Sequence, residues 1–396
     1  TLPLTRPLTQ RLSNLNEFHP NELDPFLLFD TRDSMLGELE SPTLDLDASK
    51  PDSLNVITAT RSGVATYTDA DGVIQTAPEN TVRVDHVDGV PMMLIEPSAT
   101  NLVPYSEDFG YWIKQTGTVV TPNTTETLSP DGTYNASKIT SNGTSGLYVS
   151  SVGSASENTK SVYLKGVNGG EQVILKDPNQ SITHKALTLT TEWERYTLTE
   201  TQTGGFGIWI DDIPATGIYM WGAQVETGSV ATSYIPTTSG STVQRAADNL
   251  VIDGAAFSDF YNATEGTWYC EVVPKGNEGS ANYTFIIEYG TDNTDRVGFF
   301  YYVADGSLSV TGFNSNSQYY NQTKLGDSTN QLARISYSYK SGNHKSAING
   351  TSDSDTDTVV PPANQLKLGK RIVGTKGSLV GHIKRLIYWP THSDSL

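Results

Sequence analysis

Apolar and polar residues alternate in short runs through most of the chain, and turns rich in Gly, Asn, Asp and Ser separate these runs. In the run FGIWI, Phe206, Ile208 and Ile210 fall on one side and Trp209 falls on the other. The run ARISYSYK (333–340) alternates in the same way. Alternation with a period of two is typical of strands that bury one face. Because few segments have the helical spacing of apolar residues, the pattern predicts an all-β protein.

The chain divides into four regions by pattern. Residues 1–35 contain four prolines among scattered leucines and predict an extended arm, because proline fixes φ and keeps its predecessor extended. Residues 36–98 predict a small β-region with a hairpin, in which ATYT and VIQT flank the turn DADG. Residues 99–250 and 251–396 each contain a set of short, regularly spaced strands, as in a β-sandwich.

The region 99–250 ends in an unusual way. An apolar run, GIYMWGAQVE, is followed by a long polar stretch that contains Tyr234, Ile235 and Pro236. Flexible linkers are made mainly of Gly and Ser and seldom carry such residues. We therefore expect the segment to lie back over its own sandwich, with Arg245 and Asp248 where the second sandwich begins.

Composition excludes several classes of function. The 396 residues include 44 acidic and 26 basic ones, a formal net charge of −18, without a dense Lys/Arg cluster, so nucleic acid is not an expected partner. No apolar run approaches the roughly 20 residues of a membrane span, and the N-terminus lacks the layout of a signal peptide. The single cysteine, Cys270, excludes an intrachain disulfide and is expected to be a buried core thiol.

The sequence shows no catalytic motif. The six histidines are not at metal-ligand spacing, and neither a nucleophile elbow nor a phosphate loop is present. Glu271 and Glu288 fall on adjacent predicted strands, but we interpret them as solvent-facing residues. We therefore expect no enzymatic activity. A glycan depolymerase stays open as an alternative, because catalytic acids on distant loops leave no mark in one sequence.

Two sets of residues have the composition of a sugar-binding site. Sugar C–H faces stack on aromatic rings, and neighbouring amides or acids bind the hydroxyls. The candidates in the first sandwich are Trp209, Asp211 and Asp212; those in the second are Tyr301, Tyr302, Asn314, Asn316, Gln318, Tyr319 and Tyr320. The alternative for the tyrosines is a place in the core or in subunit contacts.

An acidic run offers a candidate calcium site. Asp353, Asp355 and Asp357 are spaced two apart, which would place all three on one face of a strand. Calcium prefers such oxygen ligands. The alternative is a solvated acidic loop.

Several phrases resemble a known family. EPSATNLVPYSEDFGYWIKQ and GAQVETGSVATSYIPTTSGSTVQRAAD resemble the start and end of the carbohydrate-binding-module-like domain found in tailed-bacteriophage fibre and structural proteins. The residues that carry the likeness are Thr100, Asn101, Leu102, Asp108, Phe109, Trp112, 222–226 and 234–237. The stretch from GTWYCEVVP to GHIKRLIYWP resembles a concanavalin A-like (laminin G-like) sandwich, and LPLTRPL resembles the start of some phage virion proteins.

This resemblance implies a fold and a setting. The fold would be a jelly-roll β-sandwich followed by a concanavalin A-like one, and the location would be the virion surface, in a tail fibre or head fibre. By analogy with fibres the chain would be a homo-oligomer, as a trimer. A structural calcium is also implied, with Glu107, Asp108 and Glu226 as candidate ligands.

The resemblance likewise implies partners. The arm would attach the protein to other virion proteins or to its own copies, and the sandwiches would bind host-surface glycans. The candidate anchoring residues are Leu2, Leu4, Arg6, Leu8, Leu12 and Leu15. We therefore expect a non-enzymatic virion structural protein. The alternatives are a glycan depolymerase of a tailspike and a decoration protein without a ligand.

Overall fold

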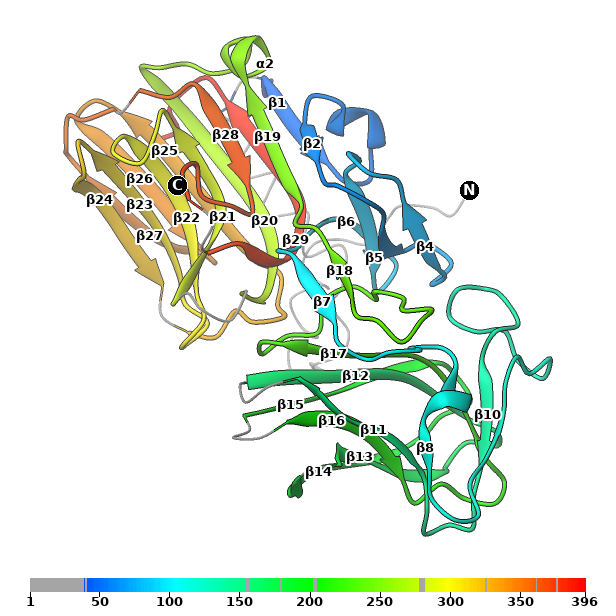
Figure 1. The fold of residues 1–396 in the computed structure, drawn as a ribbon. Helices are drawn as coiled ribbons and strands as arrows, with labels where there is room; N and C mark the ends of the chain where they lie inside the picture. Colours follow the sequence, from blue (N-terminus) through cyan, green and yellow to red (C-terminus); the bar gives the residue numbers. More distant parts are fainter. Residues whose placement is uncertain are drawn as a thin grey trace, which may run out of the picture.

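The computed structural model describes residue 39 and residues 41–153, 157–178, 180–201, 205–277, 282–324, 326–360, 362–374 and 377–396. Nearly every element in this part is a strand; the helical elements there are the short α2 (Gly254–Ser258) and two 3-10 turns (Pro51–Leu54 and Phe109–Tyr111). None of the helices described is long and apolar enough to cross a membrane. Two β-sandwiches form the two lobes of the molecule (Figure 1), so the predicted fold class is confirmed.

The first sandwich consists of two five-stranded antiparallel sheets that enclose one apolar core. One sheet has the order β15 (Glu194–Thr201), β12 (Glu157–Gly166), β17 (Ile218–Thr227), β10 (Ser137–Thr140), β9 (Val119–Thr121). The other has the order β14 (Gln180–Thr188), β13 (Gln172–Asp177), β16 (Phe206–Asp211), β11 (Leu147–Gly153), β8 (Ile113–Lys114). In β16, Phe206, Ile208 and Ile210 are buried and Trp209 faces outward, as the alternation predicts.

The second sandwich is built from an eight-stranded and a seven-stranded sheet. The larger runs β27 (Thr351–Asp355), β26 (Asn343–Ile348), β25 (Ala333–Lys340), β20 (Glu265–Asn277), β29 (Leu379–Trp389), β6 (Val90–Ile95), β5 (Arg83–Val87), with β1 (Leu44–Asp47) also paired to β29. The smaller runs β2 (Thr58–Thr60), β19 (Asn249–Asp253), β28 (Gln365–Leu368), β21 (Tyr283–Gly290), β22 (Arg296–Tyr302), β23 (Leu308–Asn314), β24 (Ser317–Lys324). Cys270 of β20 is buried in the shared core, as predicted.

Residues 44–95 supply strands to the second sandwich. The expected hairpin is present as β3 (Ala65–Thr68) and β4 (Ile74–Ala77). However, β1, β5 and β6 extend the larger sheet and β2 extends the smaller one, so this region is not a unit of its own. The physical reason is that a few short strands cannot bury enough apolar surface alone, whereas the open edges of a large sandwich offer partners for their backbone groups.

The first sandwich is therefore an insertion within the second. The chain leaves the second sandwich through β7 (Ala99–Asn101) and returns through β18 (Val243–Arg245), and these two strands pair with each other. Figure 1 shows them side by side between the lobes. Both covalent connections thus cross the junction at one place.

The segment with the Tyr-Ile-Pro sequence lies back on the first sandwich, as expected. Tyr234 and Ile235 are buried, and the Tyr234 ring lies 4.6 Å from the Trp221 ring between centroids. The Asn101 side chain donates hydrogen bonds to the backbone oxygens of Ala223 and Ile235. These contacts tie the end of the insertion to its beginning.

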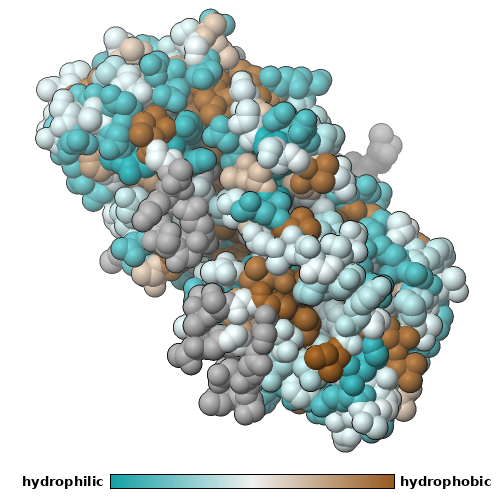
Figure 2. All heavy atoms as spheres, in the orientation of Figure 1, coloured by the Kyte–Doolittle hydropathy of each residue, from teal (hydrophilic) through white to brown (hydrophobic). Residues whose placement is uncertain are grey.

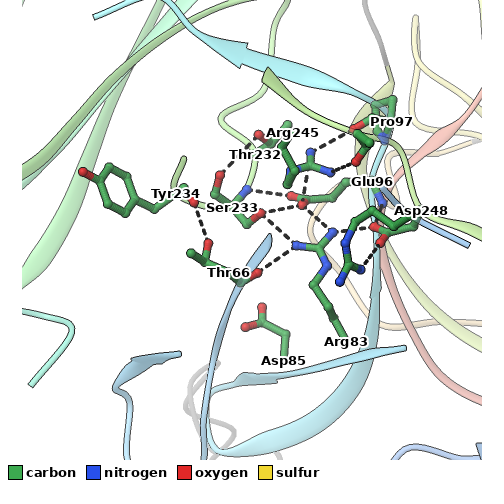
Figure 3. A network of polar contacts seen from close by, with 12 residues as sticks. Thr66, Arg83, Asp85, Glu96, Pro97, Thr232, Ser233, Tyr234, Arg245 and Asp248 are labelled. Atoms are coloured by element: carbon green, nitrogen blue, oxygen red, sulfur yellow. Dashed lines mark hydrogen bonds and ion pairs between the residues drawn. The ribbon is translucent and has the colours of Figure 1, made fainter. Parts of the chain in front are cut away.

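A buried ionic network fills the junction (Figure 3). Asp248 accepts from Arg61 at 2.8 Å and from Arg83, and Arg83 also donates to Glu96 at 2.8 Å. Arg245 forms a further ion pair with Glu96 at 3.3 Å. Burial alone would raise the pKa of Glu96, but the charges of Arg245 and Arg83 hold that pKa well below its usual range. Arg245 and Asp248 lie where the chain returns to the second sandwich; the expectation that this sandwich begins there is wrong, because its first strand is β1.

Candidate functional site

Five side chains form a row across the outer face of the β14-β13-β16-β11-β8 sheet. The pairing register joins Ile113 to Tyr148, Tyr148 to Trp209, Trp209 to Lys176, and Lys176 to His184. Of the chain neighbours of Tyr148 and Trp209, Leu147, Ile208 and Ile210 are fully buried in the core, and Val149 is partly buried against it. Because successive side chains of a strand point to opposite faces, this row, here called the outer row, points away from the core.

The centre of the outer row is an aromatic platform beside an ion pair. The rings of Tyr148 and Trp209 have centroids 5.2 Å apart and planes inclined at 41°. Lys176 Nζ lies 3.8 Å from the centroid of the Trp209 ring and 2.6 Å from Asp211 Oδ2. Both aromatic side chains are half-buried, so part of each ring meets solvent. The platform can take the C–H face of a sugar ring, while the ammonium and carboxylate bind its hydroxyls.

Two polar atoms beside the platform have unused hydrogen-bonding capacity. Among the described residues, neither Trp209 Nε1 nor Asp211 Oδ1 has a hydrogen-bond partner, although both atoms are buried. Asp211 is only 8% exposed. Other buried atoms of the described residues, such as Nε1 of Trp112 and of Trp221, also have no partner within the protein, so these two atoms do not by themselves mark a ligand site.

The structure brings together the three residues predicted in the first sandwich. Trp209 and Asp211 are neighbours on the outer face of β16, with the core residue Ile210 between them, and Asp212 follows the strand with a left-handed φ of +56°. Tyr148 and Lys176 were missed. The runs SGLYVSS and QVILKD predict the strands that contain these two residues and the side to which each side chain points. The register that places both beside Trp209 could not be predicted from the sequence.

The residues predicted in the second sandwich do not form a platform. Tyr301 and Tyr320 are 1% and 2% exposed and belong to the core, which corrects their assignment to a sugar site. The reason is that their hydroxyls find partners at the core edge, Thr329 and Ser346, each at 2.6 Å. Tyr302 and Tyr319 are half-buried. The remaining candidates, Asn314, Asn316 and Gln318, lie at the β23–β24 turn.

The calcium candidates are dispersed. Among the described residues, no group of three or more His, Cys, Asp or Glu side chains is placed to hold a metal ion. Glu107 accepts from Tyr234, Asp108 caps the 3-10 turn at Gly110, and Glu226 accepts from Thr232. Asp353 and Asp355 are exposed on the edge strand β27, and Asp357 follows it.

The two glutamates considered for catalysis lie in different sheets and do not face solvent. Glu271 is 5% exposed and pairs with Lys384 at 3.0 Å. Glu288 is fully buried and pairs with Arg296 at 3.0 Å. Both side chains point away from the core, as predicted, because their chain neighbours are core residues, but neither is exposed to solvent. An ion pair on the strand face shields each carboxylate, which the alternation of apolar residues does not reveal.

A groove of about 510 Å³ lies on the outer face of the larger sheet of the second sandwich. Tyr269, Trp389 and Leu39 line it together with Arg334 and Asn349. Both aromatic rings are already buried, at 6% and 3% exposure, so the groove lacks a free stacking surface. On the face drawn in Figure 2, hydrophobic residues form small patches among polar ones. The predicted anchoring residues of the arm lie outside the described part of the chain.

Comparison with known proteins finds partial likenesses. No family model and no curated protein matches the chain. Among solved structures, it is similar to a carbohydrate-binding module (CBM40) of a Ruminococcus gnavus IT-sialidase bound to α2,6-sialyllactose (10% identity, TM-score 0.29, 35% of this chain and 84% of that one).

Two further structures show a similar degree of likeness. They are a Trypanosoma rangeli sialidase mutant with trans-sialidase activity (10% identity, TM-score 0.30, 37% of this chain and 25% of that one) and the binding domain of botulinum neurotoxin DC in complex with rat synaptotagmin II (12% identity, TM-score 0.30, 38% of each). In both comparisons the matched part covers less than half of this chain and less than half of the known structure. The function of the present chain has to be argued from its own residues.

Proposed function

We propose that the chain is a non-enzymatic structural protein of a tailed-phage virion, a component of a tail fibre or head fibre, whose first sandwich binds host-surface glycan through the outer row. The observation that carries the binding role is the half-buried Tyr148–Trp209 platform with Lys176 and Asp211 beside it. The virion setting rests on the resemblance of the segments around 100–112 and 222–237. Assembly as a homo-oligomer, a trimer by analogy, belongs to the same proposal.

Replacing the platform tests the binding role. We expect Trp209→Ala to weaken binding on a host-glycan array at least tenfold, because the variant loses the stacking surface and the ring that orients Lys176. Tyr134→Ala is the matched control, since Tyr134 is an aromatic residue of the same sandwich that is 54% exposed outside the row. Equal binding by both variants and the native chain would remove the outer row from the proposal.

Incubation with host polysaccharide and the assembly of particles, together with the array, separate the alternatives. A depolymerase would release new reducing ends from host polysaccharide, and we expect none. A decoration protein without a ligand would give a blank array while its particles assembled normally.

Deleting the arm tests the anchoring role. We expect a chain without residues 1–35 to fold, because the described strands and both cores begin after it. The same chain should fail to incorporate into particles, which co-sedimentation with purified particles measures. The full-length chain is the control, and normal incorporation of the shortened chain would contradict an anchoring arm.

A further inference from the structure

A small polar cavity of about 150 Å³ lies at the junction of the two sandwiches, next to the ionic network. Four parts of the chain form its wall. The N-terminal strands contribute Asp85, the first sandwich contributes Tyr163 and Arg195, and the second sandwich contributes Lys275. The returning segment contributes Thr232 and Ser233. Figure 3 shows Asp85, Thr232 and Ser233 around the network.

The charges around this cavity do not balance. The cations in the cavity wall and the adjoining network are Arg61, Arg83, Arg195, Arg245 and Lys275; the carboxylates, including Glu226 near Arg195, are Asp85, Glu96, Glu226 and Asp248. One positive charge is left over within this set, in a chain whose formal net charge is −18. Charge removed from water is costly unless it is paired, so the excess calls for a counter-ion.

The carboxylates of the wall are already engaged. Asp85 accepts from the Thr68 backbone at 2.5 Å and lies 2.8 Å from His382 Nε2. Burial lowers the pKa of His382, which keeps its imidazole neutral near pH 7. Glu96 accepts from Arg83 and from Ser233. The carboxylates of the cavity wall are therefore already bonded to groups of the protein itself.

The donors of the wall are not all used. Within the described part of the chain, Lys275 Nζ and the Tyr163 hydroxyl make no hydrogen bond or ion pair, and the buried Arg195 Nε has no partner. Arg195 is held in place by its other nitrogens, which donate to Thr232 O at 2.7 Å and to Ser161 Oγ at 2.9 Å. Burial lowers the pKa of Lys275, while the charges of Asp85 and Glu96 act in the opposite direction. The cavity thus presents spare donors and one spare positive charge.

We propose that this cavity binds one small oxyanion, with Lys275, Arg195 and Tyr163 as its donors. At roughly 30 Å³ for each water, the cavity has the space of about five waters, enough for phosphate or sulfate or for the carboxylate end of an acidic sugar. It is smaller than the roughly 300–1,000 Å³ of sites for drug-sized ligands. A bound oxyanion touches both sandwiches and the returning segment, so it stabilises the junction.

Thermal unfolding of the full chain tests this site. Phosphate, sulfate and glucuronate are each titrated against sodium chloride at matched ionic strength, with glucose as the neutral control. We expect a saturable rise of a few degrees in Tm with at least one oxyanion, because a ligand that binds only the folded state stabilises it. A response to glucuronate alone identifies an acidic sugar as the ligand, and a response to phosphate or sulfate alone identifies an inorganic oxyanion. The absence of any rise beyond chloride, or an equal rise with glucose, overturns the proposal.

Two variants assign the donors. Lys275→Met should lower the affinity at least tenfold by calorimetry and abolish the rise in Tm, whereas Lys340→Met, at a lysine side chain 58% exposed, should keep both. Tyr163→Phe removes one hydroxyl and should weaken binding several-fold, which tests the site even if Lys275→Met does not fold. Unchanged affinity in both Lys275→Met and Tyr163→Phe contradicts the assignment. Trp209→Ala should keep the full oxyanion response, so failure of this site and failure of the glycan site are distinguishable.

Discussion

The Asp248→Asn variant should be about 3–5 kcal/mol less stable to unfolding than the native chain. Asp248 is 2% exposed at its side chain and stands between Arg61 and Arg83. It also accepts the backbone N–H of Glu96 at 3.0 Å. An amide has the same shape but no charge, and its NH₂ group would face arginine donors. The variant therefore leaves buried guanidinium groups without a counter-charge, which costs more than the loss of the hydrogen bonds.

Chemical denaturation of the full chain measures this loss. The matched control is Asp253→Asn, which removes the same charge from an exposed position five residues further along the chain. We expect the control to stay within the small range of surface substitutions. If Asp248→Asn were no less stable than Asp253→Asn, the network would not hold the junction.

The faces of individual strands could be predicted from the sequence because facing is a local property. Alternation over 206–210 placed Trp209 outward, and the structure agrees. The same local reasoning gave the β3–β4 hairpin, since its two strands are joined by a short turn. It also gave the burial of Cys270 within an apolar run.

Pairing between distant segments could not be predicted, and this hid the insertion. Leu44 lies opposite Tyr388, more than 300 residues along the chain. Period-two alternation tells which face of a strand is apolar, but it does not tell which strand lies beside it. The same limit hid Tyr148 and Lys176, whose places beside Trp209 depend on register across three strands.

Buried polar groups were the other source of error. Tyr320 and Glu288 are residue types usually found near the surface, yet both are buried in the second sandwich. Each has a partner that is remote in sequence or on another strand: Tyr320 bonds to Ser346, and Glu288 forms an ion pair with Arg296 and accepts from the Ile372 backbone. A single sequence does not show such partners, so its best candidates for surface chemistry include core residues.

The first sandwich contains a buried cation of its own, and its removal should have an effect comparable to that of Asp248→Asn. Lys160 of β12 is fully buried and pairs with Asp177 of β13 at 3.2 Å and with Glu200 of β15. Because β12 and β13 belong to opposite sheets, this ammonium links the two layers through the core. Lys160→Met keeps most of the side-chain volume but leaves two buried carboxylates without the ammonium. We expect a loss of about 3–5 kcal/mol in the free energy of unfolding.

Denaturation with a control and a rescue variant tests this interpretation. Lys138→Met breaks an ion pair with Glu126, whose side chain is 49% exposed, and should change stability far less, because water screens that pair. The double variant Lys160→Met/Glu200→Gln should recover part of the loss, since it removes one of the two carboxylates that the ammonium neutralised. A Lys160→Met chain that matches Lys138→Met, or a double variant less stable than Lys160→Met, would show that packing around β12, rather than this charge, holds the two sheets together.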